Sequence, residues 1–276
     1  MTEERSKAIL TVLGTVFLLL FCLFPFAWMV VISCSGAPDF LSPSSSYGFT
    51  LQHYKDIVSH PSLHFADYLR NSLLISAVAA IFATCFAGLS AYAITRMSFP
   101  GKILIPTAML ALSMFPQISV IGYLFRLMTW LGWINTYNGL IMPYISLGLP
   151  LALWIMISYF SQLPQDLDKA ALVDGATRFQ ILRKVIFPIA APGAFSTVLL
   201  LFIFCFNEFL FALMLTVDYN ARTVPVGIAL FQGLHGQIPW GIIMAAAVVS
   251  SLPIVSLAAV FQRHIVQGLT QGALKA

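Results

Sequence analysis

Glu208 is the acidic residue with the most unusual position in the sequence. It lies well inside a long apolar run from Gly193 to Thr216, directly after Asn207. If this run crosses a membrane, the carboxylate is costly there and must face a polar cavity or a partner group. Asn207 and Glu208 are therefore candidates for lining a path for a polar solute, and the alternative is that Glu208 forms a structural hydrogen bond to another helix. The residues alone leave both interpretations open.

Residue types that form catalytic and metal sites show no matching pattern. The histidines have no ligand spacing, and the four cysteines have no C-x-x-C spacing, so we predict neither a metal site nor a disulfide framework. No cluster of nucleophile, base and metal ligands emerges, which disfavours a membrane-embedded enzyme. The four cysteines are Cys22, Cys34, Cys85 and Cys205.

Residues 161–192 form a second candidate site, with the sequence SQLPQDLDKAALVDGATRFQILRKVIFPIAAP. Pro164 suits the first turn of a helix, and the segment predicts a short helix from there to about Asp174. Gly175 is expected to end this helix in a left-handed conformation. A second helix is predicted from Ala176 to Phe187, where Pro188 stops it; its apolar face consists of Phe179, Leu182 and Ile186.

This apolar face needs a cover, because nothing else in the chain is expected to be large enough to bury it. One interpretation is that another protein covers it. The other is that the helix pair lies on the membrane surface, with Arg183 and Lys184 touching lipid headgroups. The pattern favours neither interpretation.

The elements that position these candidates are predicted to be membrane helices. Hydrophobic residues make up 59% of the chain and charged residues 9%, a balance that requires lipid as the solvent. Six stretches reach the length of about 20 apolar residues that a spanning helix needs. The sequence thus predicts an all-α fold and a single transmembrane domain over residues 1–276, with spans at Ala8–Ile32, Ser72–Thr95, Ile103–Phe125, Tyr137–Phe160, Gly193–Thr216 and Trp240–Phe261.

Small residues and prolines indicate how these spans pack. In the second span, small residues at helical spacing predict a face that lets other helices approach closely: Ala77, Ala80, Ala83, Ala87, Gly88 and Ala91. Prolines inside the spans are each expected to bend a helix: Pro25, Pro106, Pro116, Pro150 and Pro253.

The basic residues predict the orientation of the chain. They are scattered among apolar segments and form no patch, so no nucleic-acid partner is expected. An even number of spans puts both termini on one side, and a cytoplasmic N-terminus leaves only Lys55, Arg70, Arg126 and Arg222 outside. The remaining basic residues then lie inside, as the positive-inside rule requires: Arg5, Lys7, Arg96, Lys102, Lys169, Arg178, Arg183, Lys184, Arg263 and Lys275.

Three segments resemble a known family. Residues 169–176 (KAALVDGA), followed by Ile186, Phe187 and Pro188, resemble the EAA loop of binding-protein-dependent ABC importer permeases, which reads approximately E-A-A-x-x-D-G-A and ends in a proline. Residues 91–96 (AYAITR) resemble the family's second-span exit, and residues 206–209 (FNEF) its fifth-span polar pair. The likeness extends along nearly the whole chain, most closely to the shorter sugar permease of the maltose and trehalose type.

The resemblance implies a type I ABC importer permease fold in the bacterial cytoplasmic membrane. It implies that the chain translocates a small sugar, such as a disaccharide or related glycoside. The implied partners are a homologous second permease, two cytoplasmic ATPases and an external solute-binding protein. The ATPases would bind ATP and magnesium, so this chain is expected to be non-catalytic and to hold no cofactor; it contains no G-x-x-x-x-G-K-[ST] phosphate loop.

The resemblance also assigns roles to residues. Contact with the ATPase is expected from the loop residues Asp168, Lys169, Ala170, Ala171, Asp174, Gly175, Ala176 and Phe179. Lys169 departs from the motif's first glutamate, so any charged contact there is changed or supplied by Asp168. The substrate path is assigned to Asn207 and Glu208. The alternative function is an ion-coupled secondary transporter in which Glu208 is the ion site.

Overall fold

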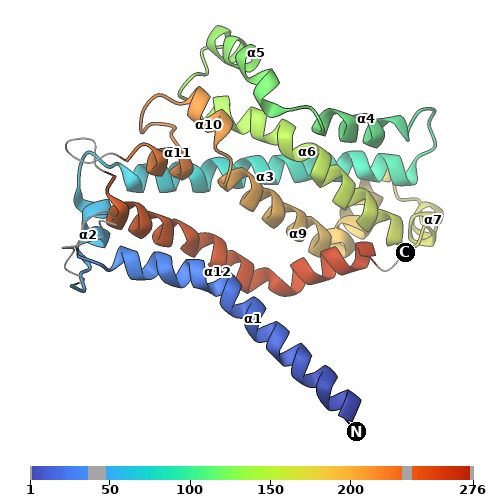
Figure 1. Cartoon of the computed structure of the whole chain (residues 1–276). Coiled ribbons are helices and arrows are strands. Elements are labelled where there is room, and N and C mark those ends of the chain that lie inside the picture. Colours follow the sequence, from blue (N-terminus) through green and yellow to red (C-terminus); the bar gives the residue numbers. More distant parts are fainter. Residues whose placement is uncertain (1, 37–47, 232–237, 274–276) are drawn as a thin grey trace. The chain divides into compact units, whose positions relative to one another are not determined.

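The computed structural model describes residues 2–36, 48–231 and 238–273, and in this part of the chain it is helical with no strand beyond one isolated bridge between Ser35 and Phe49 (Figure 1). Side chains are described from residue 7 to residue 262 within those ranges. The elements are α1 (Thr2–Ser33), α2 (Gln52–Ser59), α3 (Phe65–Arg96), α4 (Leu104–Ser113), α5 (Gln117–Trp130), α6 (Tyr137–Gln162), α7 (Asp166–Val173), α8 (Arg178–Ile181), the π-helical turn η1 (Leu182–Ile186), α9 (Phe187–Phe206), α10 (Leu210–Leu215), α11 (Val224–Ala229) and α12 (Trp240–Ala273).

The chain forms two compact units. The first comprises residues 1–66 and 228–252, and the second comprises residues 67–227 and 253–276. The single domain over residues 1–276 stays a prediction. Both candidate sites lie in the second unit, which is described below.

The described helices match the predicted spans closely, with one exception. Five helical segments are long and apolar enough to cross a membrane: Lys7–Ser33, Phe65–Arg96, Tyr137–Gln162, Arg178–Phe206 and Trp240–Gln262. The sixth span, predicted as one helix over Ile103–Phe125, is the pair α4 and α5, which is bent by 95°. Pro116 lies in the break, where it lacks an amide donor and disfavours helical geometry at the preceding residue. The predicted total of six holds if this bent pair is one span.

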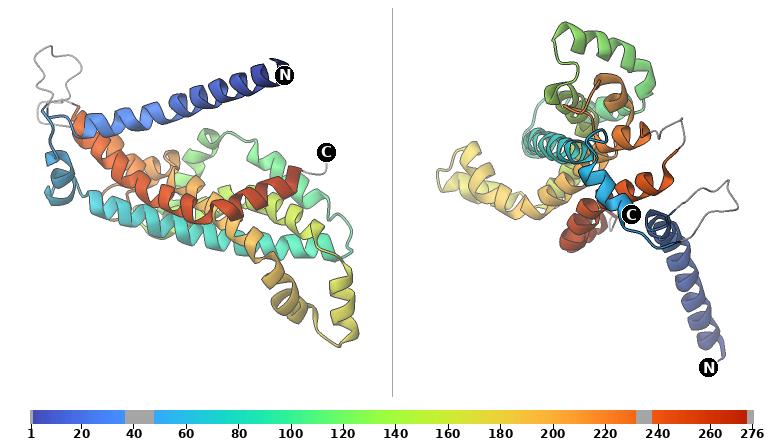
Figure 2. Two further views of the ribbon diagram at one scale, coloured as in Figure 1. Left: turned by 90° about the horizontal axis from the view of Figure 1, so that it is seen from below. Right: turned by 90° about the vertical axis from the view of Figure 1, so that its left-hand side faces the viewer.

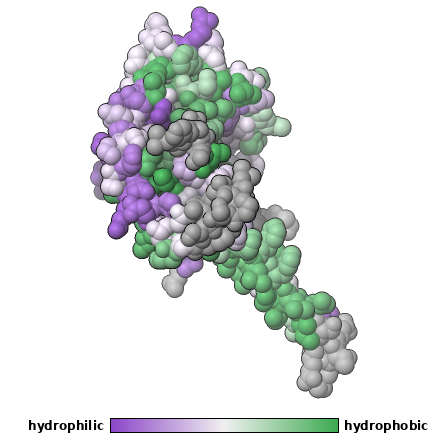
Figure 3. All heavy atoms as spheres, turned by 60° about the vertical axis from the view of Figure 1, so that its left-hand side comes forward, coloured by the Kyte–Doolittle hydropathy of each residue, from purple (hydrophilic) through white to green (hydrophobic). Residues whose placement is uncertain are grey.

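Lipid is the solvent for much of this surface. In α1 only 6% of the most apolar window is buried inside the chain, against 44% in α3, although both helices are strongly apolar. Figure 3 shows the visible face of α1 as continuous hydrophobic surface. Exposed apolar side chains of this extent match an environment of hydrocarbon.

The core of the second unit forms where small residues let helices approach. Ala80, Ala83, Ala87 and Ala91 on α3 are at most 1% exposed, which confirms the predicted packing face. They pack in one cluster with Phe160 of α6 and other large side chains of α6 and α9. Close backbone approach of this kind gives membrane helices most of their van der Waals contact.

The prediction that Pro188 ends a separate loop helix is wrong. Helical structure continues from Arg178 through η1 into α9, which ends at Phe206. Pro188 lies in the first turn of α9, where a missing amide donor costs little. The wider turn η1 resets the hydrogen-bond register just before it. The loop and the fifth span are therefore one continuous helical path.

Gly193→Ala is expected to destabilise the contact between α6 and α9. A Cβ atom at this position would lie 2.4 Å from Cδ2 of Tyr159, so the ring or the helix must move. We expect a loss of about 1–3 kcal/mol in the free energy of unfolding. Thermal unfolding in detergent measures it, with Gly122→Ala as the matched control, because a Cβ there meets nothing within 4 Å. Equal unfolding temperatures for the two variants would contradict the packing described here.

Candidate functional site

The turn between α7 and α8 is built by a glycine-terminated helix end. Gly175 has φ of +81°, which favours glycine because other residues are strained there. Its amide donates to Leu172 O at 3.0 Å, and the amide of Ala176 donates to Ala171 O at 3.0 Å. These two bonds form a Schellman motif, which satisfies the last carbonyls of α7. The predicted role of Gly175 is confirmed.

A capping box that the sequence reasoning missed begins the next helix. The side chain of Thr177 accepts from the amide of Gln180 at 3.3 Å, and the side chain of Gln180 accepts from the amide of Thr177 at 2.8 Å. The second helix thus begins after Thr177 and not at Ala176. The T-x-x-Q spacing was the available signal. With both ends fixed, the α7–α8 segment (residues 166–181) has a defined shape, and Figure 2 shows it in yellow, protruding beyond the ends of α6 and α9.

The structure places the predicted contact residues of this segment in three environments. Lys169, Ala170, Asp174, Gly175 and Phe179 are exposed, and the Phe179 side chain is 67% exposed. Ala171 and Ala176 are partly buried against the core cluster, and Asp168 is buried. Val173, which the sequence reasoning did not single out, is 88% exposed and extends the apolar surface beside Phe179.

The expectation that nothing in this chain covers the second helix is wrong for two of its three apolar residues. Ile186 is fully buried in the core cluster, and Leu182 packs against the same cluster. Because η1 continues into α9, this face turns toward α3 and α6. Only Phe179 stays exposed.

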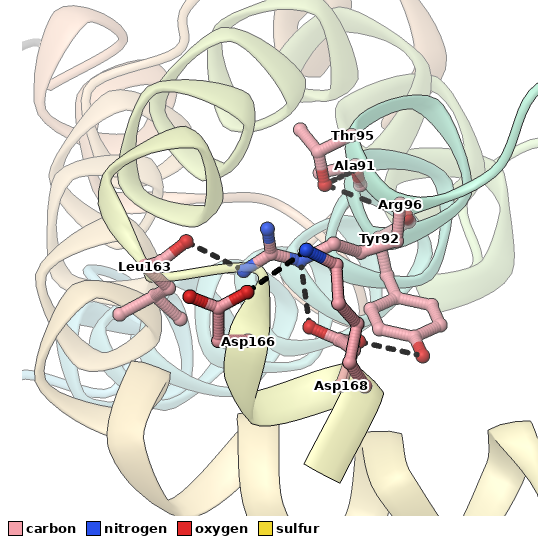
Figure 4. Close-up of polar contacts among 8 residues, drawn as sticks. Ala91, Tyr92, Thr95, Arg96, Leu163, Asp166 and Asp168 are labelled. Carbon is pink, nitrogen blue, oxygen red and sulfur yellow. Dashed lines mark hydrogen bonds and ion pairs between the residues drawn. The ribbon is translucent and has the colours of Figure 1, made fainter. Parts of the chain in front are cut away.

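Asp168 lies inside the chain, at the end of α3 (Figure 4). Its Oδ2 atom is 3.2 Å from Nε of Arg96, and the two side chains are 7% and 3% exposed. The hydroxyl of Tyr92 donates to Oδ1 of Asp168 at 3.4 Å, while Nη2 of Arg96 donates to Leu163 O at 2.9 Å. A direct surface contact between Asp168 and another protein does not fit this burial.

Lys169 and Asp166 form the exposed charged pair of α7. Nζ of Lys169 lies 2.9 Å from Oδ1 of Asp166. The hydrogen bond and the charge of Lys169 lower the pKa of the Asp166 carboxyl, and the same contact raises the pKa of Lys169. Both groups are in solvent, so the pair adds little stability. Lys169 thus presents a cation at the position where the family motif has a glutamate.

The fifth span is broken at the polar pair. The predicted continuous span Gly193–Thr216 ends at Phe206, and α10 begins at Leu210. Asn207 is exposed, and its side chain donates to Ile203 O at 2.8 Å. The helix therefore stops where the sequence has its two polar residues.

Glu208 is buried at this break and accepts three hydrogen bonds. The donors are the hydroxyl of Tyr144 on α6 at 2.8 Å, the amide of Phe211 at 2.8 Å and the amide of Ala212 at 3.1 Å. The two amides belong to the first turn of α10, where helix geometry provides no acceptor. The structural hydrogen bond to another helix, one of the two interpretations of Glu208, is thus present; the role in a substrate path stays a prediction.

A polar cluster at the other end of α3 holds the segment after α10. The side-chain amide of Asn71 donates to Tyr219 O at 2.8 Å and to Arg222 O at 3.0 Å. The amide of Val224 donates to Oγ of Ser72 at 2.8 Å. These contacts join residues about half a chain apart, so no local sequence signal could have found them.

Asn135 holds the same segment from the start of α6. It has φ of +58°, a conformation that asparagine tolerates. Its side chain accepts from the amides of Val217 and Asp218 and donates to the Asp218 carboxylate at 2.7 Å. This donation lowers the pKa of Asp218. Residues 217–224 are thus fixed to both α3 and the start of α6.

Residues 74–271 match the protein family described as "Binding-protein-dependent transport system inner membrane component". The chain is 54% identical over 276 residues to the trehalose/maltose transport system permease protein MalG of Thermococcus litoralis, covering 100% of this chain and 99% of that protein. It is 44% identical over 212 residues to the trehalose transport system permease protein SugB of Mycobacterium tuberculosis, covering 76% and 77% of the two chains.

The fold is similar to that of a solved bacterial ABC transporter involved in the import of the acidic polysaccharide alginate. The TM-score is 0.79 at 18% sequence identity, over 95% of this chain and 98% of the other. The family match and the full-length relative agree with this fold. The chain therefore belongs to the binding-protein-dependent transport system inner membrane components, the multi-pass permeases of ABC importers.

Proposed function

We propose that this chain is one of two permease subunits of an ATP-driven importer and that it translocates a small sugar, such as a disaccharide or related glycoside. The observation that carries the proposal is the 54% identity over the full chain to a trehalose/maltose permease. The 44% identity to a trehalose permease supports the same substrate class.

The proposed partners are a homologous second permease, two cytoplasmic ATPases and an external solute-binding protein. The family description supports the binding protein directly. A structure with a TM-score of 0.68 to this chain is described as an alginate ABC transporter in complex with a pentasaccharide-bound periplasmic protein. ATP and magnesium are bound by the ATPases in this proposal. Both termini and the α7–α8 segment lie in the cytoplasm, in agreement with the distribution of basic residues.

The α7–α8 segment is the proposed contact with the ATPase. Its exposed apolar side chains, Val173 and Phe179, lie on either side of a turn that its hydrogen bonds hold in one shape. Lys169, Ala170, Asp174 and Gly175 share this exposed surface, whereas Ala171 and Ala176 position it from the core side. A preformed protrusion of this kind suits docking into a cleft, because little order has to be gained on binding.

The ion-coupled secondary transporter loses its main support. That alternative needed Glu208 to be free for an ion, but its carboxylate is already bonded to Tyr144 and to the first turn of α10. Asn207, which is exposed at the break, is the better placed of the two to meet a sugar hydroxyl.

Copurification tests the proposed function. The chain is expressed with the permease, ATPase and binding-protein genes that neighbour its own gene and is purified in mild detergent. We expect a complex containing the second permease and the ATPase, with ATP hydrolysis that is stimulated by binding protein loaded with trehalose or maltose. A folded chain that brings down no ATPase would refute the proposal.

Gly175→Val is expected to reduce engagement of the ATPase. A β-branched residue at φ of +81° adds strain of about 1–2 kcal/mol or more, so the turn should reorient α7 against α8. The space around Gly175 is open, so the effect comes from backbone strain and not from a clash. ATPase pull-down and stimulation by loaded binding protein measure the effect. Gly175→Asn is the matched control, because asparagine tolerates this conformation; equal losses in both variants would argue against the turn geometry as the cause.

Glu208→Ala is expected to destabilise the chain. The substitution leaves the Tyr144 hydroxyl and two backbone amides without an acceptor in a membrane span, at about 1–3 kcal/mol for each unsatisfied group. Glu208→Gln keeps one acceptor oxygen and should lose less. Thermal unfolding in detergent and sugar uptake in vesicles are measured together. A Glu208→Gln variant with the wild-type unfolding temperature but impaired uptake would assign the carboxylate to the substrate path.

A further inference from the structure

The end of α3 is fastened to α7 by the buried ion pair of Arg96 and Asp168. We propose that Arg96 is a positioning residue for coupling, which holds α7 against α3 so that a displacement of α7 moves α3 as one body. The inference rests on the proposed function, in which α7 contacts the ATPase. It extends that function by assigning the route through which the movement leaves the α7–α8 segment.

Arg96 joins three helices at one point. It is the last residue of α3, its Nη2 atom donates to the carbonyl of Leu163 at the end of α6, and its Nε atom faces Asp168 in the first turn of α7 (Figure 4). The planar guanidinium can address two acceptors in fixed directions, which a lysine cannot do. The cation also lies at the carbonyl end of α6, where positive charge is favourable. Arg96 thus fixes both the start of α7 and the connection that leads into it.

Tyr92 widens this attachment to α8. It lies one turn before Arg96 on the same face of α3, and its hydroxyl donates to Asp168 Oδ1. Arg178, the first residue of α8, also hydrogen-bonds the Tyr92 side chain. The last turn of α3 therefore contacts both helices of the α7–α8 segment, and the segment cannot rotate without breaking these bonds.

Burial makes the Arg96–Asp168 pair hard to separate. Its side chains are 3% and 7% exposed, whereas those of Lys169 and Asp166, in the same helix, are 71% and 86% exposed. Separation of a buried pair leaves uncompensated charges at low dielectric, but an exposed pair is replaced by water at little cost. Of these two pairs, only Arg96–Asp168 can transmit force to α3.

α3 carries the movement to the opposite end of the unit. Asn71 and Ser72, near its start, hold residues 219–224 through their side chains. The distance from Asn71 to Arg96 along a helix that rises about 1.5 Å per residue is about 38 Å, which exceeds the hydrocarbon thickness of a bilayer. A single helix thus connects the α7–α8 segment to residues 219–224, and its two ends are held by polar contacts.

The experiment uses the complete complex in lipid vesicles, with Arg96→Gln, Arg96→Lys and the double variant Arg96→Gln/Asp168→Asn. The first readout is the ratio of ATPase activity with loaded binding protein to activity without it. The second is the ATP-dependent change in amide hydrogen exchange of residues 217–224. For Arg96→Gln we expect an assembled complex whose stimulation ratio falls by about 10-fold and whose exchange no longer responds to ATP. Arg96→Lys retains the charge and should give intermediate values.

Lys102→Gln is the matched control. Lys102 is a basic residue just beyond the same end of α3, and its Nζ atom donates to Met97 O without contact to α7. Both readouts should stay at the wild-type level in this variant. The loss in Arg96→Gln is then specific to the attachment of α7.

Each outcome decides the inference. Wild-type stimulation, or a wild-type exchange response, in assembled Arg96→Gln would overturn it. If Arg96→Gln does not assemble, the double variant decides, because it removes both buried charges: an assembled but poorly stimulated complex supports the inference, and normal stimulation or renewed failure to assemble overturns it. A wild-type chain that binds no ATPase refutes the proposed function itself, whereas a coupled wild type with equally coupled variants refutes only the role of Arg96.

Discussion

A bilayer offers no hydrogen bonds to the backbone of a spanning segment, so every break in a membrane helix must be satisfied by the protein itself. The fifth span shows how this chain meets the requirement. Where α9 stops at Phe206, the carboxylate of Glu208 accepts from the first turn of α10 and from Tyr144. The bond to Tyr144 also ties the break to α6. One acidic residue thus permits the interruption and fixes its position against a neighbouring helix.

The same demand for satisfied polar groups distinguishes two carboxylates that are two residues apart in α7. Asp166 faces solvent and pairs with Lys169, whereas Asp168 turns into the chain and meets Arg96. Successive helix positions differ by about 100°, so this spacing puts the two side chains on opposite faces. α7 therefore has an outer face that another protein can reach and an inner face that is fastened to α3. The two faces give the segment the form of a connector.

Local signals predicted much of this architecture. The length and apolarity of Tyr137–Gln162 or Trp240–Gln262 suffice to identify a spanning helix, because hydrocarbon selects apolar side chains over about 20 residues. Gly175 was readable as a helix end for an equally local reason, since few other residues adopt its backbone conformation. The capping box at Thr177 was present in the sequence as well and was missed.

The amino-acid sequence by itself determined that the chain is a membrane protein, where its spans lie and where the turn between α7 and α8 falls, because each depends on residues close together in the chain. Only the tertiary structure decided which face of the second loop helix is covered, because η1 shifts the register before Pro188 and turns Ile186 into the core. It likewise decided the partners of Asp168 and Glu208, which lie on α3 and α6, outside the reach of any local pattern. The chemistry of a buried charge is set by what surrounds it, and those neighbours come together only when distant helices pack.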